Sequence, residues 1–328
     1  NAIEIIVAVI ALTKDEIVVV QTSLIGSILS NLLLVMGMCF FFGGLRRSEQ
    51  FFNQVVAQTS ASLLALSIAS IVIPTCFGLF TNSNKTVFTN IASLSRGTSV
   101  ILLMVYAAYL FFQLYTHQSI FNAESQKAAM KPSRRSVAKG AVFKGLATVG
   151  GVGAGAGRPQ LMEKLAHDEL LKHDACEDEE PEEPQLHIAV AWATLAGATA
   201  ITGLCAEFMV DGISAVTSSG KVSIEFIGLI LLPIVGNAAE HATAVTVAVK
   251  DKMDLAIGVA VGSSMQIALL VIPLLVVIGW IMGKDDMSLS FDGFQVAILF
   301  VSVLLVNYLI IDGKSHWLEG MLLMCLYL

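Results

Sequence analysis

The chain has 328 residues, of which 55% are hydrophobic and 14% are charged, and its formal net charge at pH 7 is −7. Soluble globular domains carry about 25% charged residues, so the composition excludes a soluble globule and indicates a polytopic membrane protein in a lipid bilayer. The acidic balance argues against a nucleic-acid partner, and we expect none.

Seven segments are long and apolar enough to cross a bilayer, since a helical span needs about 20 apolar residues. They lie at residues 17–44, 54–80, 97–115, 187–213, 222–249, 255–282 and 291–311. The chain also begins with a short apolar piece, Ala2 to Leu12, and stops inside another, Trp317 to Leu328. We therefore interpret it as a fragment truncated at both ends, with at least one further helix expected before Asn1.

The stretch from residue 116 to residue 186 is hydrophilic. Residues 131–160 are basic and rich in Gly and Ala, which predicts a flexible linker. A short amphipathic helix is expected at residues 161–171, followed by the acidic run Glu177 to Glu183. Two interpretations of that run stay open: a solvated connector, or a regulatory segment that senses divalent cations.

A segment of thirty-five residues occurs twice in the chain. Residues 1–35 and 237–271 share twelve identical positions at a constant offset of 236, without a gap. Five further spans lead from the helix of Glu4 to the helix of Glu240, an odd number, so the two glutamate helices should run in opposite directions. Duplicated segments of opposed direction are typical of inverted-topology transporters, whose site lies near the bilayer midplane.

The orientation in the membrane is predicted from the basic residues of the loops. Lys and Arg in the short loops divide evenly between the two sides. The hydrophilic stretch adds Lys127, Lys131, Arg134 and Arg135 close to a span, and an excess of positive charge favours the cytosolic side. We therefore expect a cytosolic connector.

Glu4 and Glu240 are the candidate ion-binding carboxylates. Each lies in an apolar helix, where an ionised carboxylate costs several kcal/mol unless something binds it, by a rough estimate from insertion energetics. Asn1 and Asn237 precede them by three residues, which on a helix places each pair on one face. The next helix of each copy adds polar oxygens from these side chains: Ser27, Ser30, Asn31, Ser263 and Gln266.

Backbone oxygen is expected at the second copy as well. Pro233 and Gly236 come just before Asn237 and should break that helix, which frees carbonyl groups. A site built only from oxygen suits a hard cation that takes about 6 to 8 ligands, calcium before zinc or copper. Manganese and other divalent cations are left open as additional cargo.

His241 follows Glu240 directly, whereas the first copy has Ile5 at that position. The histidine either hydrogen-bonds a neighbour or handles protons, because the pKa of an unperturbed imidazole is about 6.5. Glu4, Glu240 and His241 are therefore the candidate proton-coupling residues.

The paired motifs resemble the signature repeats of a known family. Asn1-Ala2-Ile3-Glu4 with Gly26 to Asn31, and Gly236 to His241 with Gly262 to Gln266, are similar to those of the calcium/proton exchangers (CAX), a branch of the calcium/cation antiporter superfamily that includes the fungal vacuolar exchangers. The resemblance covers residues 1–115 and 187–328, and residues 131–160 fit no pattern of the family.

The resemblance implies both a fold and a set of site residues. The implied fold is an all-α polytopic membrane protein with two inverted-topology five-helix repeats joined by a hydrophilic acidic loop. The first repeat would occupy residues 1–115, the connector residues 116–186 and the second repeat residues 187–328. The implied site has Glu4 and Glu240 at its centre, assisted by Asn1, Asn237, Ser30 and Gln266, with Ser27, Asn31 and Ser263 nearby.

We predict a secondary antiporter rather than an enzyme, with no cofactor. Two ionised carboxylates neutralise one divalent cation, whereas an empty pair leaves two unpaired charges in a low-dielectric site. Protons can neutralise the pair instead, which makes the exchange of calcium against protons obligatory. Calcium would leave the cytosol and enter an acidic organelle across its membrane, which we expect to be the vacuolar membrane.

Two alternatives are weighed against this prediction. A sodium-coupled calcium exchanger could use the same inverted pair of carboxylates. A membrane calcium sensor or scaffold would instead bind calcium through the acidic run. Calcium, protons and lipid are the expected partners, and the sequence leaves a homo-oligomer open.

Overall fold

A computed structural model describes residues 1–80, 85–121, 125, 127–128, 187–217 and 222–328. The predicted linker at 131–160, the predicted helix at 161–171 and the acidic run 177–183 lie outside these residues. The bounds predicted for the connector, 116–186, and for the two repeats on either side therefore stay a prediction.

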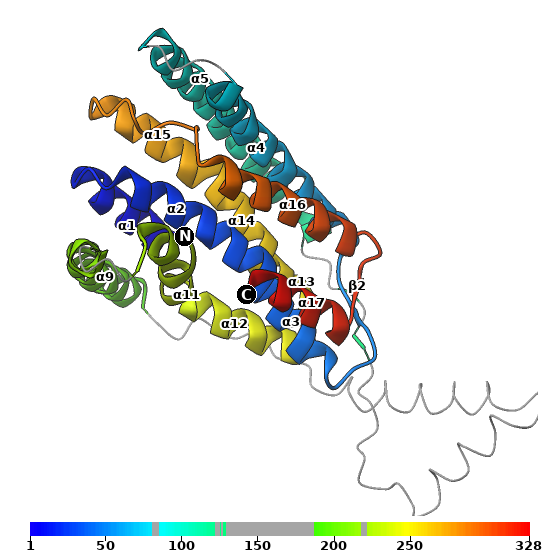
Figure 1. Ribbon diagram of the computed structural model, residues 1–328. Helices are drawn as coiled ribbons and strands as arrows, with labels where there is room; N and C mark the ends of the chain where they lie inside the picture. Colours follow the sequence, from blue (N-terminus) through cyan, green and yellow to red (C-terminus); the bar gives the residue numbers. More distant parts are fainter. Residues whose placement is uncertain (81–84, 122–124, 126, 129–186, 218–221) are drawn as a thin grey trace, which may run out of the picture.

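The first half of the chain is a series of helices joined by short loops (Figure 1). Its elements are α1 (Ala2–Thr13), α2 (Ile17–Leu29), the π-helical turn η1 (Ser30–Val35), α3 (Met36–Gly44), the strand β1 (Gln50–Phe51), α4 (Gln54–Phe80), α5 (Lys85–Phe111), the π-helical turn η2 (Phe112–Thr116) and α6 (Gln118–Phe121). α2, η1 and α3 follow one another without a break and form one span, Ile17–Gly44, which is largely buried inside the protein.

The second half repeats this plan after α9. Its elements are α9 (Ile188–Thr217), α10 (Ile224–Phe226), η4 (Ile227–Leu231), α11 (Leu232–Gly236), α12 (Ala238–Val249), α13 (Met253–Ile257), η5 (Gly258–Gly262), α14 (Ser263–Gln266), η6 (Ile267–Val271), α15 (Ile272–Ile281), α16 (Gly293–Leu309), β2 (Lys314–Ser315) and α17 (Trp317–Tyr327). α13 to α15 again form one buried span, Met253–Ile281, whereas α9 has an exposed apolar surface.

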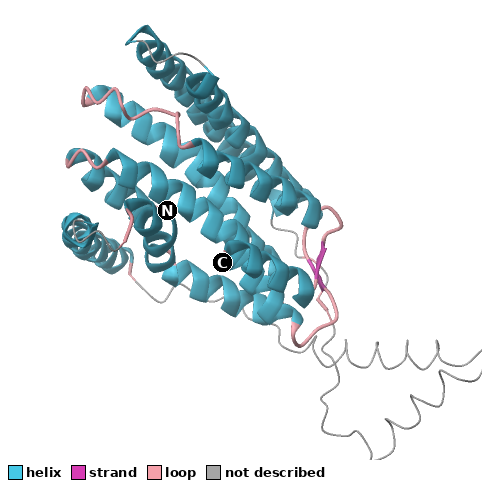
Figure 2. Cartoon of the chain, viewed as in Figure 1, coloured by secondary structure: helices cyan, strands magenta, loops and turns pink. Residues whose placement is uncertain are grey.

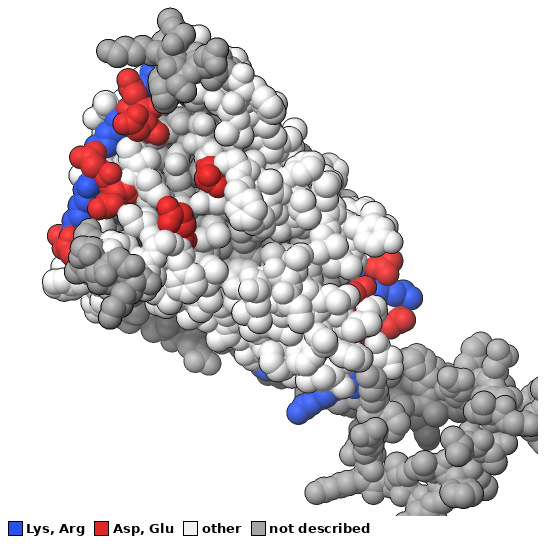
Figure 3. Space-filling model, viewed as in Figure 1, with Lys and Arg blue, Asp and Glu red and all other residues white. Residues whose placement is uncertain are grey.

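The predicted class, an all-α polytopic membrane protein, is confirmed (Figure 2). Within the described residues, five helices are long and apolar enough to cross a membrane, and a sixth span is bent. Charged side chains gather toward the two ends of the visible face, with an uncharged band between them (Figure 3).

Three predicted spans differ from the observed helices. The span predicted at 97–115 belongs to a helix that begins at Lys85, because polar residues such as Asn90 and Ser95 are tolerated in its first turns. The span predicted at 291–311 is α16, which has only 17 residues because Asp292 caps its start, where the side chain accepts bonds from Phe294 N and Gln295 N. The span at 222–249 is broken, as Pro233 and Gly236 predicted: its halves meet at Asn237 with a bend of 55°.

One pair of short strands was not expected from the sequence. β1 and β2 are antiparallel, and the registered pairs are Gln50 with Ser315 and Phe51 with Lys314. The strands join the loop after α3 to the loop before α17, so they tie the two halves together at one end of the bundle (Figure 1).

The backbone itself shows the duplication. Asp15 and Asp251, which are 236 positions apart, are the two non-glycine residues with positive φ among those described, at 61° and 63°. The π-helical turns η1 and η6 also end at related positions, Val35 and Val271. Because one turn after each glutamate helix repeats to within a few degrees, the two copies share a local structure as well as a sequence.

Two basic residues fasten each repeat to the other, one at each end of the bundle. Arg47, after α3, donates to Val249 O at 3.0 Å and pairs with Asp251 at 3.4 Å. Lys284, after α15, donates to Leu12 O at 2.5 Å and pairs with Asp15 at 2.6 Å. Each basic side chain thus binds the loop that follows the glutamate helix of the opposite repeat: Arg47 binds the loop after α12, and Lys284 binds the loop after α1. These two clasps lie on opposite sides of the apolar bundle, as inverted repeats require.

The two clasps differ in burial. The side chains of Arg47 and Asp251 are 6% and 5% exposed, whereas those of Lys284 and Asp15 are 17% and 77% exposed. Asp251 also accepts bonds from Gln50 Nε2 at 2.8 Å and Ala128 N at 2.6 Å. The clasp near the start of the connector is therefore dehydrated and multiply bonded, while the opposite clasp faces solvent.

Asp251→Asn should destabilise the full-length protein far more than Asp15→Asn. Breaking a buried pair leaves Arg47 uncompensated and costs about 3 to 5 kcal/mol, whereas an exposed pair contributes about 0 to 1 kcal/mol. Asparagine tolerates positive φ, so neither turn is strained by the change. Denaturant titration of both variants in detergent measures the loss in free energy of unfolding. An equal loss for the two variants would contradict the assigned burial.

The helix α2 and the π-helical turn η4 cross in close contact. A Cβ at Gly26 would lie 2.4 Å from Leu229 O and 2.6 Å from Pro233 Cγ, so only glycine fits there. The repeat-related Gly262 has open space at the same point. The two glycines occupy equivalent positions in the repeats, but only Gly26 has a packing role.

Gly26→Ala and Gly262→Ala form a matched pair. We expect Gly26→Ala to destabilise the protein by about 1 to 3 kcal/mol, because the added methyl group overpacks the crossing. Gly262→Ala should have little effect on the melting temperature, since alanine favours helix over glycine and meets no atom. Thermal unfolding of the two purified proteins gives the comparison, and a larger loss for Gly262→Ala would refute it.

Candidate cation-binding site

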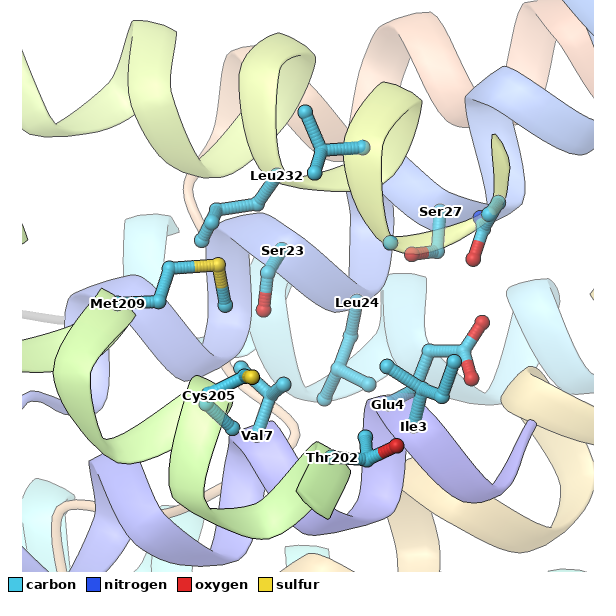
Figure 4. Close-up of a pocket in the computed structure, with 14 residues that line it drawn as sticks. Ile3, Glu4, Val7, Ser23, Leu24, Ser27, Thr202, Cys205, Met209 and Leu232 are labelled. Atoms are coloured by element: carbon cyan, nitrogen blue, oxygen red, sulfur yellow. The ribbon is translucent and has the colours of Figure 1, made fainter. Parts of the chain in front are cut away.

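Each glutamate of the duplicated segment opens into its own cavity. The cavity at Glu4 has a volume of about 190 Å³ and is walled by α1, α2, α9 and α11. Figure 4 shows Glu4 beside Ser27, with Thr202 and Cys205 of α9 across from α1. The cavity at Glu240 has a volume of about 400 Å³ and is lined by Asn1, Ser263 and Gln266 among others. The structure thus gathers seven of the nine predicted metal-binding residues around two openings.

The linings of the two cavities correspond across the duplication. At the offset of 236, these pairs line equivalent places: Glu4 and Glu240, Ser27 and Ser263, Asn237 and Asn1, Ile3 and Ala239, Val7 and Thr243, Ser23 and Val259. The site is therefore duplicated in three dimensions as well as along the chain.

The asparagines are exchanged between the copies. Asn237 lines the cavity of Glu4, and Asn1 lines the cavity of Glu240. This differs from the expectation that each asparagine shares a helix face with the glutamate three residues later. Asn1 and Asn237 are the N-caps of α1 and α12 and lie outside the helices proper, with Asn237 at φ −97° and ψ 10°, so helical spacing does not apply to them.

A chain of hydrogen bonds runs through the cavity of Glu240. Ser263 Oγ lies 2.7 Å from Asn1 Oδ1 and 3.3 Å from Glu240 Oε2. Asn1 Nδ2 donates to Gln266 Oε1 at 2.5 Å, and Gln266 Nε2 donates to Tyr106 Oη at 3.2 Å. Four predicted site residues therefore form one connected network.

The cavity of Glu4 holds groups that lack hydrogen-bond partners. Glu4 is 9% exposed, and its Oε1 atom has no partner among the described residues, nor does Asn237 Nδ2. Glu4 Oε2 and Glu240 Oε1 lie 3.9 and 3.8 Å from the backbone nitrogen of Asn1, so the two carboxylates approach each other around the N-cap of α1. A buried carboxylate without a partner is costly, and this arrangement favours a cation or protons at the Glu4 carboxylate.

The two other predicted ligands lie outside both cavities. Ser30 Oγ is 3.3 Å from His241 Nε2, and both residues are buried. Asn31 is also buried, and its Nδ2 atom lacks a partner among the described residues. His241 therefore faces a serine of the first copy, and its assignment to proton coupling stays a prediction.

The available ligands are oxygens. Within the part of the chain that the structure describes, no three His, Cys, Asp or Glu side chains cluster as a metal site. Any cation held here would depend on the two carboxylates together with amide, hydroxyl and backbone oxygens, the ligand set of hard cations.

Some lining residues were not predicted from the sequence. Thr243 could have been found, because it lies at the offset of 236 from Val7 and three residues after Glu240. Thr202 and Cys205 of α9, and Tyr106 of α5, lie outside the duplicated segment, so its pattern contains no signal for them.

The fold and the site together define a class: a helical membrane protein of inverted repeats with a buried and a half-buried glutamate between its helices, the architecture of secondary ion transporters. The sodium/calcium exchanger protein family matches residues 1–115 and 190–328. The chain belongs to this family, and the resemblance drawn from the paired motifs is confirmed.

Named relatives extend this comparison. The vacuolar calcium ion transporter of Cryptococcus neoformans var. grubii is 41% identical and that of Schizosaccharomyces pombe 42%, both over 100% of this chain. The chain spans 60% and 67% of their lengths. The solved structure of native YfkE, a Ca2+/H+ antiporter, has a TM-score of 0.71 and 30% identity and covers 100% of this chain and 78% of its own.

Proposed function

We propose that this chain forms the transport core of a calcium/proton antiporter that moves calcium from the cytosol into an acidic organelle. The observation that carries the proposal is the pair Glu4 and Glu240, a buried and a half-buried carboxylate that approach each other around the N-cap of α1. The relatives named vacuolar calcium ion transporters support calcium as cargo and the vacuolar membrane as location. The neighbour YfkE, a Ca2+/H+ antiporter, supports protons as the counter-ion.

Charge balance explains why the exchange is coupled. One Ca2+ neutralises both carboxylates, and two protons do the same, whereas the empty ionised pair leaves buried charge that is costly in a low-dielectric interior. The cation-loaded and proton-loaded states are therefore the ones that can change orientation. Calcium transport in one direction then requires proton transport in the other.

The neutral oxygens complete the proposed binding set. Asn1, Ser263 and Gln266 lie with Glu240, and Ser27 and Asn237 lie with Glu4. We assign Ser30 and Asn31 to the outer part of the site, since Ser30 contacts His241 rather than a carboxylate. Manganese fits the same hard ligands and stays an additional candidate cargo.

The inverted repeats supply the means of alternating access. The two glutamate helices belong to opposed repeats, and α11 and α12 meet at a bend of 55° beside Asn237. Helix ends at a break of this kind leave backbone groups free to serve an ion, which is the common construction in transporters with midplane sites. We further propose that the connector lies in the cytosol and that no cofactor is needed.

A sodium-coupled exchange is the second candidate, because the matching family is that of sodium/calcium exchanger proteins. The two candidates differ in the gradient that drives calcium uptake. Proteoliposomes with calcium outside and either an acidic or a sodium-rich lumen, at gradients of equal size, separate them: calcium uptake driven by sodium alone would replace the proton proposal.

Glu4→Gln and Glu240→Gln should each abolish calcium/proton exchange in the full-length protein. Glutamine keeps the size of the side chain but neither neutralises the cation nor releases a proton. Glu225→Gln, at an exposed position of α10, serves as the control for loss of a carboxylate. Calcium flux in proteoliposomes at equal protein amounts is the measurement, and near-normal flux in either variant would disprove the site.

Gln266→Ala should weaken calcium affinity while leaving the proton dependence of transport unchanged. An uncharged ligand does not titrate. Its loss should raise the apparent dissociation constant for calcium about tenfold, equivalent to about 1.4 kcal/mol. Flux measured over a series of calcium concentrations at several pH values tests this. A shifted pH optimum with unchanged calcium dependence would contradict the assignment.

A further inference from the structure

We propose that Tyr106 is a positioning residue for the cation site: its hydroxyl accepts the Gln266 Nε2 hydrogen bond and so holds the Gln266 carbonyl oxygen toward the cation. The proposal deepens the proposed function and rests on it. It assigns a role to a residue of α5 that lies outside the duplicated segment.

A glutamine ligand needs an orientation that its own shape does not provide. The side-chain amide has an oxygen that can bind a cation and an NH2 group that cannot, and the two ends are nearly the same size. A rotation of the amide by half a turn would direct NH2 at the cation. Something in the protein must therefore distinguish the two ends.

The hydrogen-bond network has a direction from Ser263 to Tyr106. The Ser263 hydroxyl has one proton, and its shorter contact is to Asn1 Oδ1, which accepts it at 2.7 Å, while Glu240 Oε2 lies 3.3 Å away. The Asn1 amide then directs its NH2 group to Gln266 Oε1 at 2.5 Å. This leaves the Gln266 NH2 group on the side of Tyr106, whose oxygen accepts it at 3.2 Å.

Tyr106 matters most when the cation arrives. A cation bound by the oxygens of Asn1 and Gln266 competes with the bond between these two amides, so that bond cannot hold the glutamine in the loaded site. The bond to Tyr106 is on the far end of the amide and is compatible with a bound cation. It is the contact that keeps the Gln266 oxygen turned inward in both states.

The tyrosine itself is held in place by packing. α5 packs against η6, which directly follows Gln266. The Tyr106 ring lies 6.3 Å from that of Tyr109, and the Tyr109 ring packs edge-on against Phe121 at 6.5 Å. The hydroxyl of Tyr106 therefore has a fixed place from which to accept.

The opposite repeat provides a matched control. Ser30 occupies the position equivalent to Gln266, and the half-buried Tyr327 of α17 places a buried hydroxyl beside it. A serine has no amide to orient, so the Tyr327 hydroxyl has no positioning role of the kind proposed for Tyr106. Tyr327→Phe removes a buried hydroxyl from a similar setting without removing an orienting bond.

The test is calcium transport by the full-length protein in proteoliposomes, with calcium concentration and pH varied. Tyr106→Phe should raise the calcium KM about threefold to tenfold, as expected from the loss of one neutral hydrogen bond. The maximal rate should stay within about twofold and the pH profile should not move. Tyr327→Phe should leave the calcium KM unchanged.

A double-mutant cycle separates positioning from a general effect on structure. In a Gln266→Ala background, Tyr106→Phe should have no further effect on KM, because the amide that it orients is gone. Calcium titration calorimetry on the purified proteins should show the same pattern in affinity. An unchanged KM for Tyr106→Phe, or the same increase in both backgrounds, would overturn the proposal.

The outcome is independent of the test of the proposed function. Retained exchange in Glu240→Gln would remove the carboxylate site itself, whatever Tyr106→Phe does. Inactive Glu240→Gln together with an unchanged KM in Tyr106→Phe would leave the antiporter proposal in place and remove only the role of the tyrosine.

Discussion

A buried carboxylate, Glu4, with the half-buried carboxylate of Glu240 near it is the constraint on which the rest of the molecule depends. Glu4 is 9% exposed and has an oxygen without a protein partner, in a region where charge is costly. Among the described residues, those that line the two cavities add neutral oxygens and a second carboxylate but no lysine or arginine. Binding of a cation or of protons would relieve the cost of this charge, as the proposed exchange requires.

The two repeats are equivalent at this centre and different around it. Both have the positive-φ aspartate, the serine and the asparagine at related positions. Their supports differ: Gly26 is in close contact with η4 while Gly262 is free, and one clasp is buried while the other faces solvent. The site residues at the centre thus follow the duplication closely. The packing and ion pairs that stabilise the two halves around this centre differ.

Much of this could be predicted from the sequence, because the duplication leaves an identity pattern and membrane spans leave a hydropathy pattern. The glutamate pair, the opposed helices and the break after Pro233 follow from such local signals. The exchange of Asn1 and Asn237 could not be predicted, since it depends on how helix caps of two distant segments meet. Tyr106 was missed for the same reason: its contact with Gln266 spans 160 residues and belongs to no repeated motif.

The exchanged asparagines also bear on how such a protein could have arisen. A single repeat has a glutamate whose cavity lacks its asparagine, because that side chain comes from the other half. An ancestor with one repeat would have needed a second copy inserted upside down beside it to complete either site. The present chain makes that antiparallel association permanent by covalent linkage, and it lets the two halves acquire different surroundings while each still completes the site of the other.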